Sequence, residues 1–317
     1  MSVSNRLKAM AILAVAAMAW TGGCAPSCPQ THVSREELVH DYNQNASAVP
    51  RLKARARISL TIADAKGRRF SWGSTLASPN GLLILAKGDQ AVGEVDFALI
   101  GRMTGATELF RMGVSNTDGA YYLWYNAGNQ HGAWWGRREL AGAPDVEIPL
   151  DPTQLLSVLC VTELPADFTT VPTVAMTLSD NPCAYVLTFI DRQPLTGQIV
   201  FRREMFFRRN DKLPRRPFLV NIFDNDGRRA MSATLRAYKP IALAGLPPSS
   251  PAIAPVMPTD IDISWKGNNR LHLVLSEMTT AEDWDRQQLL FTPNLPRAIP
   301  LENVLQVDKN VAGGATE

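Results

Sequence analysis

Alternating polar and apolar residues mark the start of the folded part of the chain. Between residues 51 and 62 every second side chain is apolar, from Leu52 to Ile62, and most of the side chains between them are basic. Successive side chains of a strand point to opposite faces, so this pattern predicts a strand with one buried and one solvated face. Turn sequences such as Asn80-Gly81 and Asp118-Gly119 follow at short intervals, which is typical of an antiparallel meander.

The same reasoning predicts a mainly β protein with few helices. Strands are expected at residues 52–63, 69–78, 81–87, 93–100, 108–115, 120–125, 132–138, 173–179, 184–190, 198–208, 217–224, 229–238, 260–263 and 271–276. One helix is expected at residues 35–46, where Ser34 and Glu37 form a capping box. A second is expected at residues 152–160, where Asp151 can cap the first turn and Pro152 suits its first position. A short acidic helix is expected near residues 281–288.

The N-terminal residues have the features of an export signal. Arg6 and Lys8 precede an apolar run at residues 9–20, which is too short to span a bilayer as a helix. The sequence Thr21-Gly22-Gly23-Cys24 follows, and it resembles the lipobox of bacterial lipoproteins, apart from threonine where an aliphatic residue is usual. The resemblance implies cleavage before Cys24 and attachment of diacylglycerol and acyl chains to it, with no other cofactor.

Two consequences of this segment stay open at the level of sequence. Ala25 after the cysteine favours the outer membrane over the inner one, according to the sorting rule of the best-known systems. The alternative is an ordinary secretory peptide cut near Ala25, which leaves Cys24 or Cys28 free or disulfide-bonded.

Changes in composition divide the chain into five parts. Residues 1–23 are the expected signal peptide, 24–34 a tether, and 35–241 the main β domain. Residues 242–258 are a proline-rich strap with almost no charge. Residues 259–317 are a β and helical extension that completes the same domain and ends in a flexible tail.

Charge and motifs exclude several classes of protein. The formal net charge of +2 disappears once Arg6 and Lys8 are removed with the signal peptide, and a neutral chain is a poor candidate for nucleic-acid binding. Apolar residues make up 45% of the chain, which is ample for a large core. The sequence contains no nucleophile elbow, zinc-binding helix, phosphate loop or dinucleotide fingerprint. We therefore expect neither an enzyme nor a metal site.

Cys160 and Cys183 are the natural disulfide pair in an oxidising compartment. Closing the loop between them would stabilise the fold by about 3 kcal/mol. The alternative is a pair of buried free thiols.

The combined pattern resembles the Lol lipoprotein carrier and acceptor superfamily over residues 35–240. The resemblance is carried by the lipobox, the N-terminal helix, the long meander, the short helix opened by Asp-Pro, and the strand Asp118-Gly119-Ala120-Tyr121-Tyr122-Leu123-Trp124-Tyr125. It implies a curved antiparallel sheet forming an unclosed half-barrel, capped by short helices, with a space that holds acyl chains and no catalytic residue. This chain differs in its strap and its C-terminal extension, and in being itself lipidated, as the acceptor is and the soluble carrier is not.

Aromatic side chains gather between residues 121 and 135, and an apolar sheet face must be covered by another layer, a partner or a ligand. The candidate cavity-lining residues are Leu60, Trp72, Leu83, Phe97, Phe110, Tyr122, Trp124 and Trp135. The alternative is that they are ordinary core residues.

The leading hypothesis is a monomeric, lipid-anchored, periplasm-facing protein of the cell envelope. It would bind the acyl chains of a lipoprotein or lipid in its cavity without chemistry. The alternative is a non-transporting interaction or scaffold lipoprotein with a filled core, and an enzyme of unrecognised type comes third.

Overall fold

The structure is a computed structural model, and it describes only part of the chain. The described residues are 28–29, 32–63, 69–72, 80–88, 95–102, 107–127, 130–140, 148, 150–193, 196–209, 216–243, 254–266, 268–280, 291, 293, 295–296 and 299–308. Several predicted features lie outside them: Cys24 and the signal peptide, the helix near 281–288, most of the strap, the second half of the strand at 69–78, and the C-terminal tail. Val33–Glu317 form one compact unit, and Met1–His32 form a separate one.

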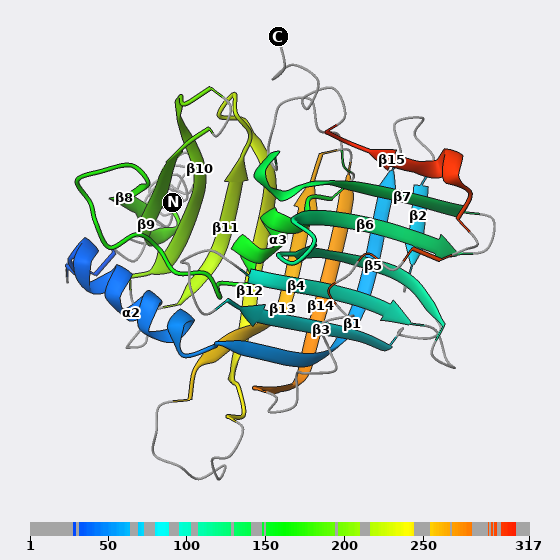
Figure 1. Cartoon of the computed structure of the whole chain (residues 1–317). Helices are drawn as coiled ribbons and strands as arrows, with labels where there is room; N and C mark the ends of the chain where they lie inside the picture. The colour runs from blue at the N-terminus through cyan, green and yellow to red at the C-terminus, as the bar shows by residue number, and fades with distance from the viewer. Residues whose placement is uncertain are drawn as a thin grey trace, which may run out of the picture. The chain divides into compact units, whose positions relative to one another are not determined.

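A single sheet, with fifteen strands in the described part of the chain, dominates the compact unit (Figure 1). Its strands are β1 (Arg51–Ala63), β2 (Arg69–Trp72), β3 (Asn80–Lys87), β4 (Val95–Arg102), β5 (Glu108–Ser115), β6 (Ala120–Ala127), β7 (Gln130–Arg137), β8 (Thr173–Asp180), β9 (Cys183–Arg192), β10 (Ile199–Arg208), β11 (Pro217–Phe223), β12 (Arg229–Pro240), β13 (Val256–Trp265), β14 (Asn269–Thr279) and β15 (Val304–Gln306). Fourteen follow the order β15-β7-β6-β5-β4-β3-β1-β14-β13-β12-β11-β10-β9-β8, and β2 pairs with β1.

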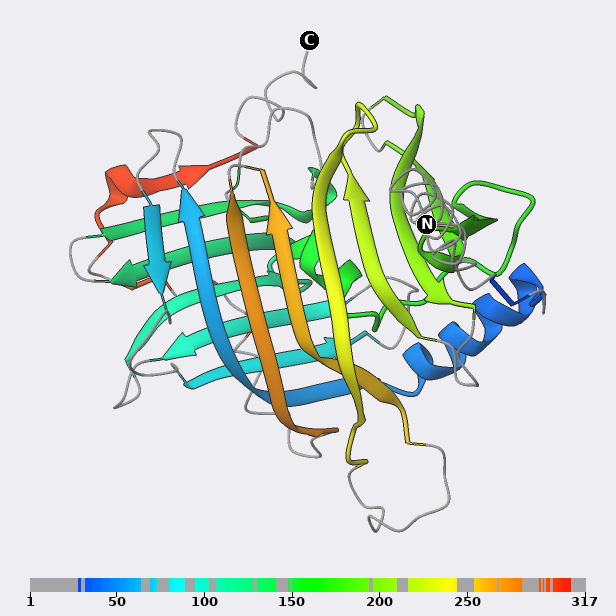
Figure 2. The ribbon, with the colours of Figure 1, turned by 180° about the vertical axis from the view of Figure 1, so that it is seen from behind.

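The sheet is strongly curved and does not close. Figures 1 and 2 show β3 to β7 running across the direction of β12 to β14, with the long strand β1 bending from one direction into the other. Among the described residues, the path ends at β15 on one side and at β8 on the other, and these two do not pair. The prediction of a mainly β, unclosed half-barrel is therefore confirmed.

The alternation in β1 has the predicted effect. Leu52, Ile58 and Leu60 are buried, whereas Arg55 and Arg57 are exposed. Burying a side chain such as leucine or isoleucine contributes about 1.5–3 kcal/mol, so a one-residue slip of this strand would be costly. The position of β1 in the sheet is thereby fixed between β3 and β14.

The C-terminal part of the chain supplies the middle of the sheet. β13 and β14 lie between β1 and β12, and they join the strands of the first meander to those that follow α3. β15 pairs in parallel with β7. Sequence reasoning missed β15, because three residues are too few to show an alternating pattern.

Within the described residues, two α-helices accompany the sheet. α2 (Arg35–Ser47) begins at Ser34, whose hydroxyl accepts a hydrogen bond from the backbone N–H of Glu37 at 3.0 Å. α3 (Pro152–Val158) begins at Asp151, whose carboxylate accepts from the N–H of Thr153 at 2.8 Å. These N-caps were both predicted. Two 3-10 turns are η1 (Arg138–Leu140) and η3 (Leu301–Asn303). Among the described helices, none has the length and apolarity needed to cross a membrane.

Candidate functional site

One face of the sheet carries the main hydrophobic core, and we call it the inner face. Its core cluster includes residues of α2, α3, the first meander and the strands from β8 to β14. α3 packs against β5 and β6 on this face, and its buried side chains are Pro152, Leu155, Leu156 and Val158. The two short helices and the residues around them are therefore the described cover of the inner face.

Four of the predicted cavity-lining residues lie together on the inner face. Leu60, Leu83, Phe97 and Phe110 belong to the main core cluster and are each 0% exposed. A side chain without accessible area borders no space that admits a water molecule. In the described part of the chain, the protein itself therefore covers these four residues completely.

Three other candidates lie on the opposite, outer face. Tyr122, Trp124 and Trp135 form a separate cluster with Ala133 and Ile299. The register explains the separation: Phe110 pairs with Tyr125, so Trp124 and Tyr122 point away from the face that carries Phe110. The aromatic group between residues 121 and 135 is thus divided between the two faces. The side chain of the eighth candidate, Trp72, is outside the described residues.

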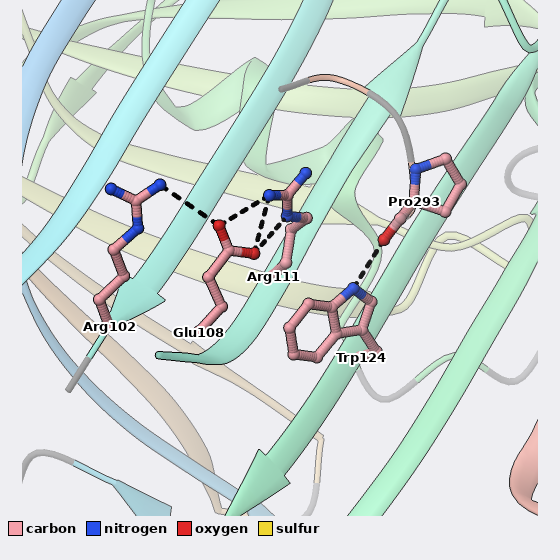
Figure 3. Close-up of polar contacts among 5 residues, drawn as sticks. All are labelled: Arg102, Glu108, Arg111, Trp124 and Pro293. Atoms are coloured by element: carbon pink, nitrogen blue, oxygen red, sulfur yellow. Dashed lines mark hydrogen bonds and ion pairs between the residues drawn. The ribbon is translucent and has the colours of Figure 1, made fainter. Parts of the chain in front are cut away.

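Residues of the C-terminal segment cover the outer aromatic cluster. The indole N–H of Trp124 donates to the carbonyl of Pro293 at 2.8 Å (Figure 3). Ile299 and Val304 pack nearby, and Phe291 packs on the outer face of β3 and β4. This cover explains why large aromatic side chains on the outer face are buried.

The outer face also holds a buried ion-pair network. Arg111, only 2% exposed, donates to Glu108 through Nε at 3.0 Å and through Nη2 at 2.7 and 2.8 Å. Arg102 adds a bond to the same carboxylate at 3.3 Å, and Figure 3 shows Glu108 between the two guanidinium groups. Such bidentate pairs satisfy a buried charge, so this network supports the fold.

Sequence reasoning missed several inner-face residues of β5 and β6. Met112, Val114, Tyr121 and Leu123 belong to the main core cluster, each with at most 1% exposure. The sequence signal for Met112 and Val114 was their spacing of two and four residues from Phe110, which places all three on one face of a strand. In the structure Met112 pairs with Leu123 and Val114 with Tyr121. They lie on the strands that α3 covers.

The predicted disulfide between Cys160 and Cys183 is wrong. Cys160 has a free thiol and is buried, and Cys183 and Cys28 are the disulfide-bonded cysteines among the described residues. Cys160 follows the end of α3 with φ of +58°, and its thiol donates to the carbonyl of Val158 at 3.3 Å. Sequence spacing gives the loop length between two cysteines but not the direction in which their side chains point.

A small polar cluster lies inside the core where α3 ends. It consists of Cys160, Tyr42 from α2, Arg203 from β10 and Tyr238 from β12. The hydroxyl of Tyr238 donates to the carbonyl of Pro217 at 2.6 Å, and Arg203 Nη1 donates to the carbonyl of Ser157 at 3.2 Å. Burial raises the pKa of Cys160 to about 12 and raises the pKa of Tyr42 and of Tyr238 above their ordinary values. The thiol and both phenols are therefore neutral at physiological pH.

Comparison with known proteins gives likeness in fold only. No family model matches the chain, and no curated protein matches it. Similar solved structures include a domain from Vibrio parahaemolyticus named for a proposed role in outer membrane lipoprotein sorting, with 10% identity, 81% of this chain and 97% of that chain covered, and a TM-score of 0.46. A DUF1329 family protein from Desulfovibrio piger has 11% identity and a TM-score of 0.44, and the match covers 78% of this chain and 92% of that chain. A LolA superfamily protein from Nitrosomonas europaea has 10% identity and a TM-score of 0.41, and the match covers 82% of this chain and 98% of that chain.

Proposed function

We propose that this chain is a non-enzymatic, lipid-anchored protein of the cell envelope that binds an acyl chain of a lipoprotein or lipid on its inner face. The site would lie under α3, against β5 and β6. Cys24 would carry the lipid anchor and hold the protein at the periplasmic side of a membrane, the outer membrane rather than the inner.

The supporting observation is that a short helix, α3, covers part of a continuous apolar face. α3 has only seven residues, and isolated helices shorter than about 12–15 residues are marginal in water. Its position therefore depends on the packing of side chains such as Leu155, Leu156 and Val158. A ligand that supplies equivalent apolar surface can take their place.

The free energies of burial favour replacement of the α3 side chains by an acyl tail. Each buried CH2 group contributes about 0.8 kcal/mol, and each of the three α3 side chains contributes about 1.5–3 kcal/mol. A tail of about fourteen CH2 groups therefore offers roughly 11 kcal/mol relative to water, against about 5–9 kcal/mol for the three side chains it displaces. Relative to a bilayer the tail gains little, because lipid is equally apolar. Reversible loading and release at a membrane is the expected behaviour.

A second candidate function is a scaffold or interaction lipoprotein with a filled core. The observation in its favour is the complete burial of Leu60, Leu83, Phe97 and Phe110. In this case the inner face needs no ligand, and a protein partner would bind elsewhere.

Native mass spectrometry of the full chain separates the two functions. The protein is purified from envelope membranes in a mild nonionic detergent and then incubated with palmitoyl lipids. Acyl binding predicts additional lipid beyond the covalent anchor, in a saturable one-to-one complex. A stable protein partner and no added lipid would instead support the scaffold. In the same spectra, a Cys24→Ser variant should lose the anchor mass, and retention of that mass would contradict lipidation at Cys24.

A further inference from the structure

A buried arginine on β10 lies in the apolar interior at the end of α3. Arg203 is 6% exposed, and it lies on the same face of β10 as Met205 and Phe207, which belong to the main core cluster. Its Nη1 donates to the Ser157 carbonyl at 3.2 Å, and its guanidinium lies 5.3 Å from the ring centroid of Phe189. Its buried Nε has no hydrogen-bond partner among the described residues.

Arg203 differs from the other buried arginines of the described chain in lacking a carboxylate. Arg111 is paired with Glu108 at 2.7 Å, and Arg209, 8% exposed, is paired with Asp180 at 3.2 Å. No aspartate or glutamate within the described ranges lies at ion-pair distance from Arg203. The carbonyl of Ser157 supplies only a partial negative charge, as expected at the end of a helix. A buried charge without a counterion is strongly disfavoured.

The groups near Arg203 do not supply the missing negative charge. Its charge acts on Tyr42 and Cys160, where it lowers the pKa of each, but burial is the larger effect and keeps both groups protonated. The Tyr42 hydroxyl is buried beside Cys160 and Thr162 but makes no hydrogen bond of normal geometry with any described residue. The interior therefore holds one cation and one unsatisfied hydroxyl in the same cluster.

We propose that Arg203 and Tyr42 form the binding site for the anionic head of a single-chain amphiphile, whose tail occupies the inner face under α3. This inference rests on the proposed function and names its ligand class. When α3 is displaced, the guanidinium Nη1–H leaves the Ser157 carbonyl. Nε and Nη2, whose N–H groups point the same way, can donate in parallel to two oxygens of a carboxylate or phosphate, and the Tyr42 hydroxyl can donate to the same head.

The apolar surroundings select the class of anion. Phe207 packs edge-on against Tyr42 with ring centroids 6.3 Å apart, and Met205 lies beside Arg203 on the same face of β10. A free inorganic anion would lose its hydration on entry without any apolar gain. An anion attached to a hydrocarbon tail, such as a fatty acid or an alkyl phosphate, gains both hydrogen bonds from Arg203 and burial of its tail among apolar side chains.

The test compares probes that share one tail and differ in the head. The full chain in a nonionic detergent is titrated with palmitate, hexadecyl phosphate and uncharged hexadecanol. We expect the anionic probes to bind roughly tenfold to hundredfold more tightly than hexadecanol, which is the range of a charge-assisted hydrogen bond. Whichever anion binds more tightly identifies the head as a carboxylate or a phosphate.

Variants separate the head site from the tail site. Arg203→Gln should abolish the preference for anions and leave hexadecanol binding unchanged, whereas Arg202→Gln, next to it on the outer face of β10, should change neither. If Arg203→Gln fails to fold, Tyr42→Phe provides the second variant. It removes a hydroxyl that makes no hydrogen bond of normal geometry with any described residue, so it should fold and should weaken palmitate several-fold but not hexadecanol.

The outcomes distinguish this inference from the proposed function. Equal binding of palmitate and hexadecanol by the wild type, or an anion preference that survives both Arg203→Gln and Tyr42→Phe, overturns the anion site and leaves acyl binding intact. Failure of every probe to bind overturns the proposed function as well. A preference for palmitate over hexadecanol that disappears in the Arg203→Gln variant supports both the anion site and the proposed acyl binding.

Discussion

Shortening Leu155 in α3 should weaken the cover of the inner face and increase acyl binding. Leu155 is fully buried, and Leu→Ala substitutions in cores cost about 2–5 kcal/mol because a cavity remains. An acyl tail can refill the space of the three lost carbon atoms. At about 0.8 kcal/mol per carbon, this restores roughly 2 kcal/mol, which lowers the dissociation constant about thirtyfold.

The matched control is Ile84→Ala. Ile84 is also 0% exposed, but it belongs to the cluster on the outer face with Ala98 and Ile100. It should lose a similar amount of stability without any gain in acyl binding. The assay is palmitate titration of the full chain, combined with thermal unfolding with and without palmitate. A Leu155→Ala variant that binds palmitate no better than the wild type, or an Ile84→Ala variant that gains equally, would refute the displacement of α3.

Three further predictions follow from single contacts. Trp124→Phe removes the indole hydrogen bond to Pro293 and should cost about 0.5–1.5 kcal/mol, with faster hydrogen exchange in residues 299–308; unchanged exchange there would count against the role of this contact. Burial favours the protonated form of Asp308, but hydrogen bonds from the Arg137 backbone N–H, Gln306 and the Arg137 side chain outweigh it and lower its pKa. Its stabilising effect is therefore complete above the ordinary aspartate pKa and is lost as the pH falls below about 4; an Asp308→Asn variant with the same acid sensitivity would disprove this. The thiol of Cys160 should resist alkylation in the unliganded protein, because it is buried with a pKa of about 12, and palmitate should accelerate the reaction; rapid labelling without ligand would contradict the closed cluster.

The sequence predicted the local elements well because their signals are local. The alternation of β1 and the caps at Ser34 and Asp151 depend on residues close in the chain, and the structure places them as expected. The turn residues between strands likewise act within a few positions. For these features no knowledge of the tertiary fold was needed.

Features that depend on distant pairing were not predictable in the same way. Alternation shows that Tyr122 and Trp124 share a face, but only the register with β5 and the cover by Ile299 show that this face is the outer one. The central position of β14 beside β1 depends on residues more than two hundred positions apart. The wrong disulfide prediction has the same cause, because the partner of a cysteine depends on how distant segments are placed: the Cys160 thiol is free and buried, whereas Cys183 is disulfide-bonded.

Mapping of a photoactivatable palmitate on the full chain tests acyl binding on the inner face most directly. After irradiation and digestion, we expect saturable cross-links to Met112, Leu123 and Leu155, all on the inner face or on α3, and we expect unlabelled palmitate to abolish them. Cross-links restricted to outer-face residues such as Tyr122, or labelling that excess palmitate does not reduce, would contradict it.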